Sequence, residues 1–121
     1  MAKNMEIALL YDFYGEVLTE KQQNMVDLYY NNDLSLAEIA ENEGITRQGV
    51  RDSVKRAETQ LLEMEERLHL AQRFKQMHAD FEQIERDARE IAELNDRTGY
   101  LREIAERADR IQRLAQALIR Q

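Results

Sequence analysis

The segment SLAEIAENEGITRQGVRDSVKRAETQL, residues 35–61, has the pattern of a helix-turn-helix. Ser35 followed by Glu38 forms a capping box, which predicts the start of a short first helix. Gly44 supplies a left-handed turn that most residues resist. Thr46 is a suitable N-cap for the second helix. The sequence therefore predicts two helices joined at Gly44.

The second helix of this motif has an apolar face and a largely basic face. Its apolar positions fall within about 60° of one another at 100° per residue, and they are Val50, Val54, Ala57 and Leu61. The side chains that we expect to be exposed for nucleic-acid binding are Arg47, Gln48, Arg51, Lys55 and Arg56, with Asp52 among them. Arginine and glutamine hydrogen-bond base edges in a major groove, and lysine binds phosphate.

Two further helices are predicted before this motif. Apolar residues at steps of three and four from Ile7 to Leu18 indicate the first. A capping box formed by Thr19 and Gln22 begins the second, which we expect to end at residues 31–33. Together these helices predict an N-terminal helix-turn-helix domain over residues 1–66.

Beyond the motif, the sequence predicts one uninterrupted helix over residues 46–93, a break at 95–99 and a last amphipathic helix over 101–118. A helix of about 48 residues is roughly 70 Å long, so the preceding residues cannot cover its whole apolar stripe. We therefore expect residues 67–121 to form a coiled-coil hairpin in a homodimer. The predicted dimerisation residues are Leu61, Met64, Leu68, Phe74, Phe81, Ile84 and Ile91.

Composition supports an all-α fold and limits the chemistry. Of 121 residues, 34% are charged, and four glycines with no proline suit long exposed helices. The absence of cysteine excludes disulfides and cysteine-built zinc sites. His69 and His78 are nine residues apart, on opposite sides of a helix. We predict no catalytic residue, metal or cofactor, and hence no enzyme.

Charge and hydropathy bear on partners and location. A net charge of −7 means that any nucleic-acid binding must come from a local basic patch. No window of 18 uncharged apolar residues is present, so we expect no membrane insertion and a cytoplasmic protein.

Several segments resemble the YlxM-type family of small bacterial helix-turn-helix proteins. They are YDFYG (11–15), LTEKQ (18–22), LYY (28–30), SLAEIA (35–40) and TRQGV (46–50), within a resemblance that covers about residues 5–75. The same residues are similar, more distantly, to region four of bacterial sigma factors, which reads promoter DNA. The resemblance implies a dimeric, all-α, non-catalytic protein that modulates the signal recognition particle pathway by binding the particle's RNA or protein.

Three hypotheses remain open at this point. The first is a regulatory or accessory factor of the signal recognition particle that contacts RNA and protein. The second is a DNA-binding transcriptional regulator that uses the helix over residues 46–61. The third is a protein-only adaptor that uses the long acidic helices. Salt dependence distinguishes them, because binding to several phosphates weakens steeply with salt.

Overall fold

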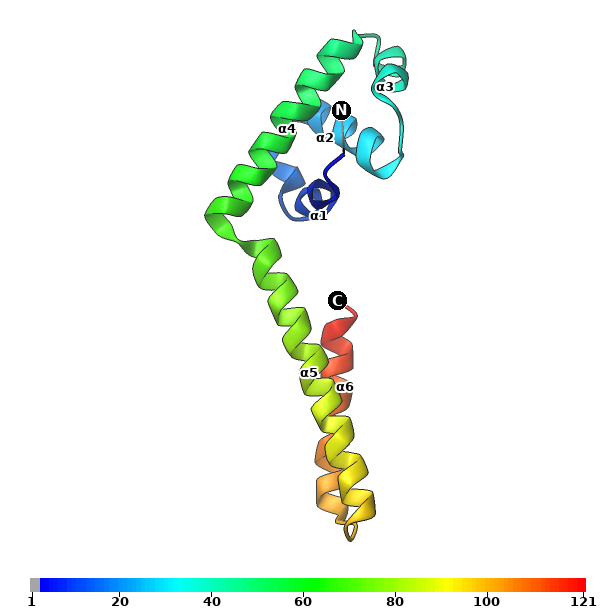
Figure 1. Cartoon of the computed structure of the whole chain (residues 1–121), viewed down its shortest axis with the longest axis vertical. Coiled ribbons are helices and arrows are strands. Elements are labelled where there is room, and N and C mark those ends of the chain that lie inside the picture. The colour runs from blue at the N-terminus through cyan, green and yellow to red at the C-terminus, as the bar shows by residue number, and fades with distance from the viewer. Residues whose placement is uncertain (1–2) are drawn as a thin grey trace. The chain divides into compact units, whose positions relative to one another are not determined.

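The structure, a computed structural model, describes residues 3–121. Its elements are α1 (Met5–Tyr14), the 3-10 turn η1 (Gly15–Val17), α2 (Glu20–Val26), the π-helical turn η2 (Asp27–Asn31), α3 (Leu36–Glu43), α4 (Arg47–Leu68), α5 (Leu70–Arg97) and α6 (Arg102–Ile119). The all-α prediction is confirmed (Figure 1). The chain divides into two compact units, unit 1 up to Ala71 and unit 2 over Gln72–Gln121. The predicted domain boundary at 66/67 stays a prediction.

The predicted helix starts of unit 1 are confirmed. The Thr19 hydroxyl accepts from the Gln22 amide at 3.1 Å, and both halves of the capping boxes at Thr19 and Ser35 are present. Gly44 ends α3 with a φ of 69°. That left-handed conformation is open to glycine without strain. The chain therefore forms the helix-turn-helix that its capping residues predict.

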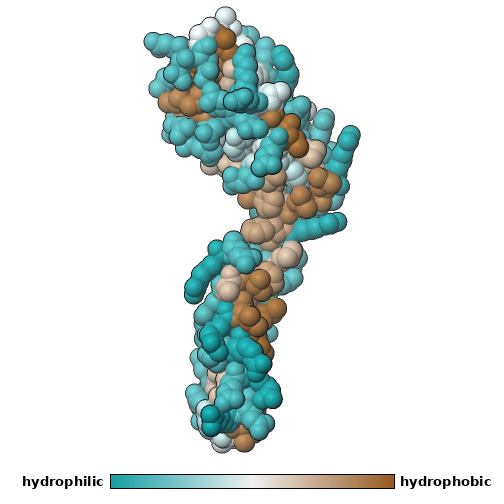
Figure 2. All heavy atoms as spheres, turned by 180° about the vertical axis from the view of Figure 1, so that it is seen from behind, coloured by the Kyte–Doolittle hydropathy of each residue, from teal (hydrophilic) through white to brown (hydrophobic). Residues whose placement is uncertain are grey.

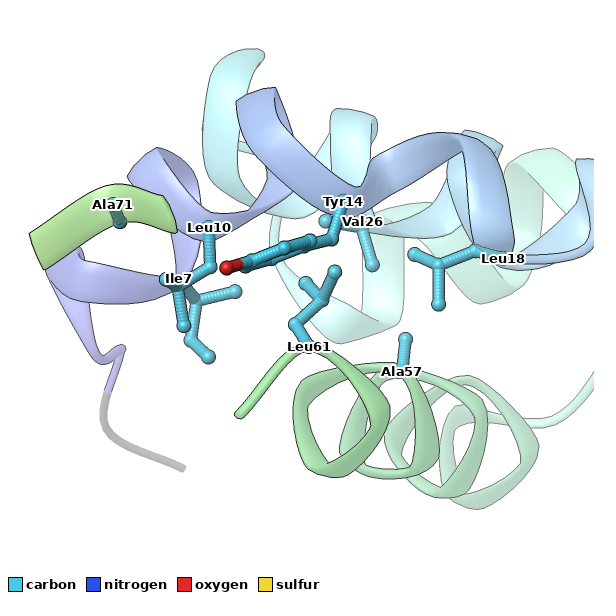
Figure 3. Packing of buried hydrophobic residues seen from close by; sticks show 8 residues of the cluster. All are labelled: Ile7, Leu10, Tyr14, Leu18, Val26, Ala57, Leu61 and Ala71. Atoms are coloured by element: carbon cyan, nitrogen blue, oxygen red, sulfur yellow. The ribbon is translucent and has the colours of Figure 1, made fainter. Parts of the chain in front are cut away.

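Unit 1 folds around α4, which packs against α1, α2 and α3. One cluster of buried residues joins α1 and α2 to the C-terminal part of α4: Ile7, Leu10, Tyr14, Leu18, Val26, Ala57, Leu61 and Ala71 (Figure 3). A second joins α2, η2 and α3 to the N-terminal part of α4: Met25, Tyr29, Leu36, Ile39, Ala40, Val50 and Val54. The apolar face predicted for the second helix is thus the side that packs inward.

The helix predicted from Thr19 to about Asn31 changes to a π-helical turn, η2, after Val26. The wider turn lets the adjacent residues Tyr29 and Tyr30 both pack inward. Tyr29 is buried, and the Tyr30 hydroxyl donates to Glu58 of α4 at 2.8 Å. Sequence periodicity missed this turn because it assumes a constant number of residues per turn.

The prediction of one uninterrupted helix over residues 46–93 is wrong. Helix α4 ends at Leu68, and His69 adopts a left-handed conformation with a φ of 56°. The Tyr14 hydroxyl donates to the Glu65 carboxylate at 2.6 Å and accepts from the Leu70 amide at 3.1 Å. Glu65 also accepts from the Ala71 amide at 3.0 Å. The break is therefore stabilised by a side chain 56 positions away from Leu70, which local sequence does not reveal.

Unit 2 is an antiparallel hairpin of α5 and α6 (Figure 1). The predicted break at 95–99 is confirmed, since α5 ends at Arg97 and Gly99 has a φ of 96°. Asn95 fixes the turn, because its side chain donates to the Leu101 carbonyl at 2.9 Å and accepts from the Leu101 amide at 3.0 Å.

The dimerisation residues predicted from periodicity lie in different environments. Leu61 is fully buried in the core of its own unit, so it is not available to a second chain. Met64 and Phe81 are half-buried, and the exposed members are Leu68, Phe74, Ile84 and Ile91. Inside the hairpin the fully buried apolar residues are alanines, Ala88, Ala108 and Ala115. The large apolar residues therefore lie beside the contact between α5 and α6, and dimerisation through them stays a prediction.

Candidate nucleic-acid interface

The candidate interface begins where α4 begins. The Thr46 hydroxyl accepts from the Gly49 amide at 3.0 Å, which fixes the first turn of the helix. A Cβ atom at Gly49 would lie 3.1 Å from that hydroxyl oxygen, so a glycine suits this position. Val50 and Val54 are fully buried and anchor the helix to the core of unit 1. The opposite side of the first turns of α4 is exposed.

The structure brings the five predicted binding residues together on the first three turns of α4. These residues, all exposed, form what we call the basic face: Arg47, Gln48, Arg51, Lys55 and Arg56. Gln48 donates to Asp52 at 3.0 Å, which occupies one of its amide hydrogens. Within residues 3–121, none of the ion pairs uses any of the four cations of this face. Their charges are therefore available to phosphate.

A hollow of about 440 Å³ lies beside the basic face, lined by Leu36, Arg47, Gln48 and Arg51. Leu36, the first residue of α3, was not predicted as part of the interface. Its position directly after the Ser35 cap was the available signal, because the start of α3 lies next to the start of α4 in a helix-turn-helix. The hollow gives the arginine side chains a concave surface rather than a bare helix.

A neighbouring hollow of about 480 Å³ shares Leu36 and Arg47 and extends to Lys3. The ammonium group of Lys3 lies 2.6 Å from the Asp33 carboxylate and 4.6 Å from the centre of the Tyr29 ring. Lys3 is therefore already paired, and its hydrogen bond lowers the pKa of Asp33. The hollow lined by Arg47 and Arg51 thus has two unpaired cations, whereas Arg47 is the one unpaired cation of its neighbour.

The basic character of α4 ends after Arg56. The following turns carry Glu58, Glu63 and Glu66. Glu58 accepts a hydrogen bond from the Tyr30 hydroxyl. The pKa of that hydroxyl is raised, mainly by burial and secondly by this hydrogen bond. An approaching nucleic acid would therefore be attracted by the first three turns of α4 and repelled by those that follow.

The two histidines and the carboxylates were the other candidates for a functional site. No group of three or more His, Asp or Glu side chains in residues 3–121 is arranged to hold a metal ion. His69 ends α4, whereas the His78 ring bonds the Ile119 carbonyl at 3.2 Å. None of the described helices combines the length and apolar character needed to cross a membrane.

The family model described as "UPF0122: Putative helix-turn-helix protein, YlxM / p13 like" matches residues 1–101. The chain belongs to the UPF0122 family. That description is of a helix-turn-helix family and names no enzymatic activity.

UPF0122 proteins from three bacteria show the extent of the similarity. The protein of Desulforamulus reducens is 55% identical over 71 residues, which are 59% of this chain and 61% of the relative. That of Acetivibrio thermocellus is 48% identical over 91 residues, 75% of this chain and 78% of the relative. That of Thermoanaerobacter sp. (strain X514) is 42% identical over 108 residues, which are 89% of this chain and 92% of the relative. The match thus spans less than two thirds of the first relative and nearly all of the third.

Proposed function

We propose that this UPF0122 protein is a cytoplasmic, non-enzymatic accessory factor of the signal recognition particle that contacts the particle's RNA through the basic face of α4. One observation carries the proposal: four unpaired cations lie together on an exposed helix of a chain whose net charge is −7. The resemblance to YlxM-type proteins supplies the choice of ligand.

Duplex DNA is the second candidate ligand. The observation that favours it is the position of the basic face on the N-terminal turns of the second helix of a helix-turn-helix, where DNA-binding proteins of this kind contact bases. Arg47, Arg51 and Gln48 also have the side-chain types that bond base edges. The experiment must therefore present both nucleic acids.

The test is a fluorescence anisotropy titration of the labelled full-length protein with signal recognition particle RNA, with random duplex DNA as competitor, at several salt concentrations. We expect RNA binding that weakens steeply with salt and that DNA does not displace. Each lost phosphate contact should reduce the slope of log K against log[salt] by about 1.

The variant that isolates the basic face is Arg51→Glu with Lys55→Glu. Reversing two charges at the interface should weaken RNA binding by at least about tenfold, since two phosphate contacts become repulsive. Lys75→Glu with Arg86→Glu, an equal charge change on exposed residues of α5, is the matched control and should bind nearly as the wild type does. Equal affinity of both variants for RNA would contradict the RNA contact.

The same titration with the particle's protein in place of RNA tests the protein-only adaptor. Binding that does not weaken with salt would favour that hypothesis.

A further inference from the structure

Two adjacent hollows at the start of α4 differ in charge. The one that we call the arginine hollow is lined by Leu36, Arg47, Gln48 and Arg51. The described residues that line it include no carboxylate, whereas two acidic residues, Asp33 and Glu38, line its neighbour. Its volume of about 440 Å³ is within the range in which proteins bind small molecules. The arginine hollow is therefore the part of this surface that can receive one unit of a polyanion.

An RNA duplex cannot receive α4 in the way that a DNA duplex does. The major groove of B-DNA admits a helix, whereas the major groove of an RNA duplex is deep and too narrow for side chains to read. Proteins that recognise an RNA sequence bind bases in loops and bulges, where the bases are unpaired. An RNA contact by the basic face therefore calls for a place beside α4 that accepts an unpaired base.

The arginine hollow has the groups that hold a base. Arg47 and Arg51 are exposed, lie one helical turn apart on the same side of α4, and form no ion pair within residues 3–121. Guanidinium planes stack on bases. Most of the surface of unit 1 that Figure 2 shows is hydrophilic. Leu36, at the start of α3, gives the hollow an apolar contact that such a surface offers in few places.

Gln48 is held in one orientation by Asp52. Its side-chain amide donates to the Asp52 carboxylate at 3.0 Å. Since an ionised carboxylate accepts hydrogen bonds and donates none, the amide nitrogen faces Asp52. The second amide hydrogen and the carbonyl oxygen remain for a ligand, and this donor and acceptor match N7 and the N6 amino group of adenine. Of the four bases, adenine is therefore the one that Gln48 selects.

We propose that the arginine hollow binds an unpaired adenine of RNA, an inference that rests on the proposed function. The base contacts Leu36 and stacks on the guanidinium groups of Arg47 and Arg51. Gln48 bonds the edge of the base that carries N6 and N7. Asp52 is a positioning residue, because it acts through Gln48.

The first test compares three RNA hairpins with the same stem, by fluorescence anisotropy with the labelled full-length protein. One stem is fully paired, one has a single unpaired adenine, and one has an abasic nucleotide in place of that adenine. The unpaired adenine should tighten binding about tenfold over the paired stem, and the abasic form should lose this gain. The slope of log K against log[salt] should be the same for the adenine and abasic forms, because they have equal numbers of phosphates.

The outcomes separate this proposal from the proposed function. Equal affinity for the paired stem and the adenine hairpin would overturn the proposal and leave the RNA contact of the basic face intact. No binding to these hairpins or to the particle's RNA would overturn both. A paired DNA duplex that binds as tightly as the adenine hairpin would overturn the proposal, because α4 would then fit a major groove.

The second test changes the side chains that select the base, both of which are exposed and outside the core. Gln48→Ala should reduce the preference for an unpaired adenine over an unpaired uracil about fivefold, with binding to the paired stem nearly unchanged. Asp52→Ala should reduce this preference about threefold and yet tighten binding to the paired stem, because a negative charge is removed from the basic face. Gln60→Ala, at an exposed glutamine later in α4, is the matched control and should bind as the wild type does. An unchanged preference for adenine in both Gln48→Ala and Asp52→Ala would overturn the proposal.

Discussion

Unit 1 and the hairpin are both built from helices with an apolar side, but they bury very different side chains. The largest fully buried side chains in residues 3–121 all belong to unit 1, among them Ile7, Leu10, Met25, Ile39 and Leu61. In the hairpin the buried apolar residues are alanines. Four helices of unit 1 enclose an interior, whereas two helices side by side have only a contact line. A two-helix layer therefore leaves large apolar residues exposed until another layer covers them.

Polar groups also have different roles in the two regions. In unit 1 the side chains of Thr19, Ser35 and Thr46 cap helices at the surface. In the hairpin, Glu85 and Asn95 are buried between the helices. Both are hydrogen-bonded, Glu85 to Arg89 and Gln112 and Asn95 to Leu101. Buried polar contacts of this kind fix the alignment of two helices more than they add stability.

The largest expected effect is on stability, in a comparison of a buried leucine of unit 1 with an exposed isoleucine of the hairpin. Leu61→Ala should lower the free energy of unfolding of unit 1 by about 2–5 kcal/mol, because a fully buried side chain leaves a cavity. Ile84→Ala removes a side chain that is 45% exposed and should cost less than about 1 kcal/mol in dilute protein. Urea unfolding provides the measurement, followed by tyrosine fluorescence, for which four of the five tyrosines lie in unit 1, and by circular dichroism for all helices.

Protein concentration sharpens this contrast. The cost of Leu61→Ala should be the same at low and high concentration, whereas that of Ile84→Ala should grow with concentration, as it does for residues buried in a dimer. An Ile84→Ala cost that is already several kcal/mol in the monomer would contradict the difference between the two regions.

A smaller effect is expected at the break between α4 and α5. Tyr14→Phe removes the hydroxyl that bonds Glu65 and the Leu70 amide, and we expect a loss of about 1–2 kcal/mol. Amide hydrogen exchange should also become faster at Leu70 and Ala71, where helix α5 starts. Tyr100→Phe, at a residue of 58% exposure, is the control. Unchanged exchange at Leu70 would show that the break does not depend on Tyr14.

Features that depend on residues close together in the sequence could be predicted, and those that depend on distant residues could not. Capping by Thr19, Ser35 and Thr46 and the turn at Gly44 act within four residues, and the structure places all of them as predicted. The position of the five predicted binding residues on one exposed helix face also followed from local periodicity. The break at His69 did not, because distant Tyr14 stabilises it.

Periodicity was also ambiguous in the hairpin. It marked Ile84 and Ile91 as contact residues, whereas the structure buries Ala88 between them and exposes both isoleucines. Choosing between neighbouring stripes requires knowledge of what packs on each, which the sequence of one helix does not contain.

The smallest expected effect is the pH dependence of the hairpin. The hydrogen bond from Arg89, opposed by desolvation and aided by Gln112, lowers the pKa of Glu85 below its usual value. The folded hairpin therefore binds the Glu85 proton less readily than the unfolded chain does. The resulting stability is present above the ordinary carboxyl pKa, about 4.3, and is lost as the pH falls below it.

Glu85→Gln tests this linkage, since the amide keeps the shape and cannot ionise. The urea midpoint of the wild type should fall between pH 5 and pH 3 more than that of the variant does, followed by circular dichroism. Glu106→Gln, at an exposed carboxylate of α6, is the control and should retain the wild-type pH dependence. Identical slopes for the wild type and Glu85→Gln would mean that the buried carboxylate has no energetic part in the hairpin. The buried alanines and Asn95 would then account for its alignment, and the polar contrast between the two regions would be weaker.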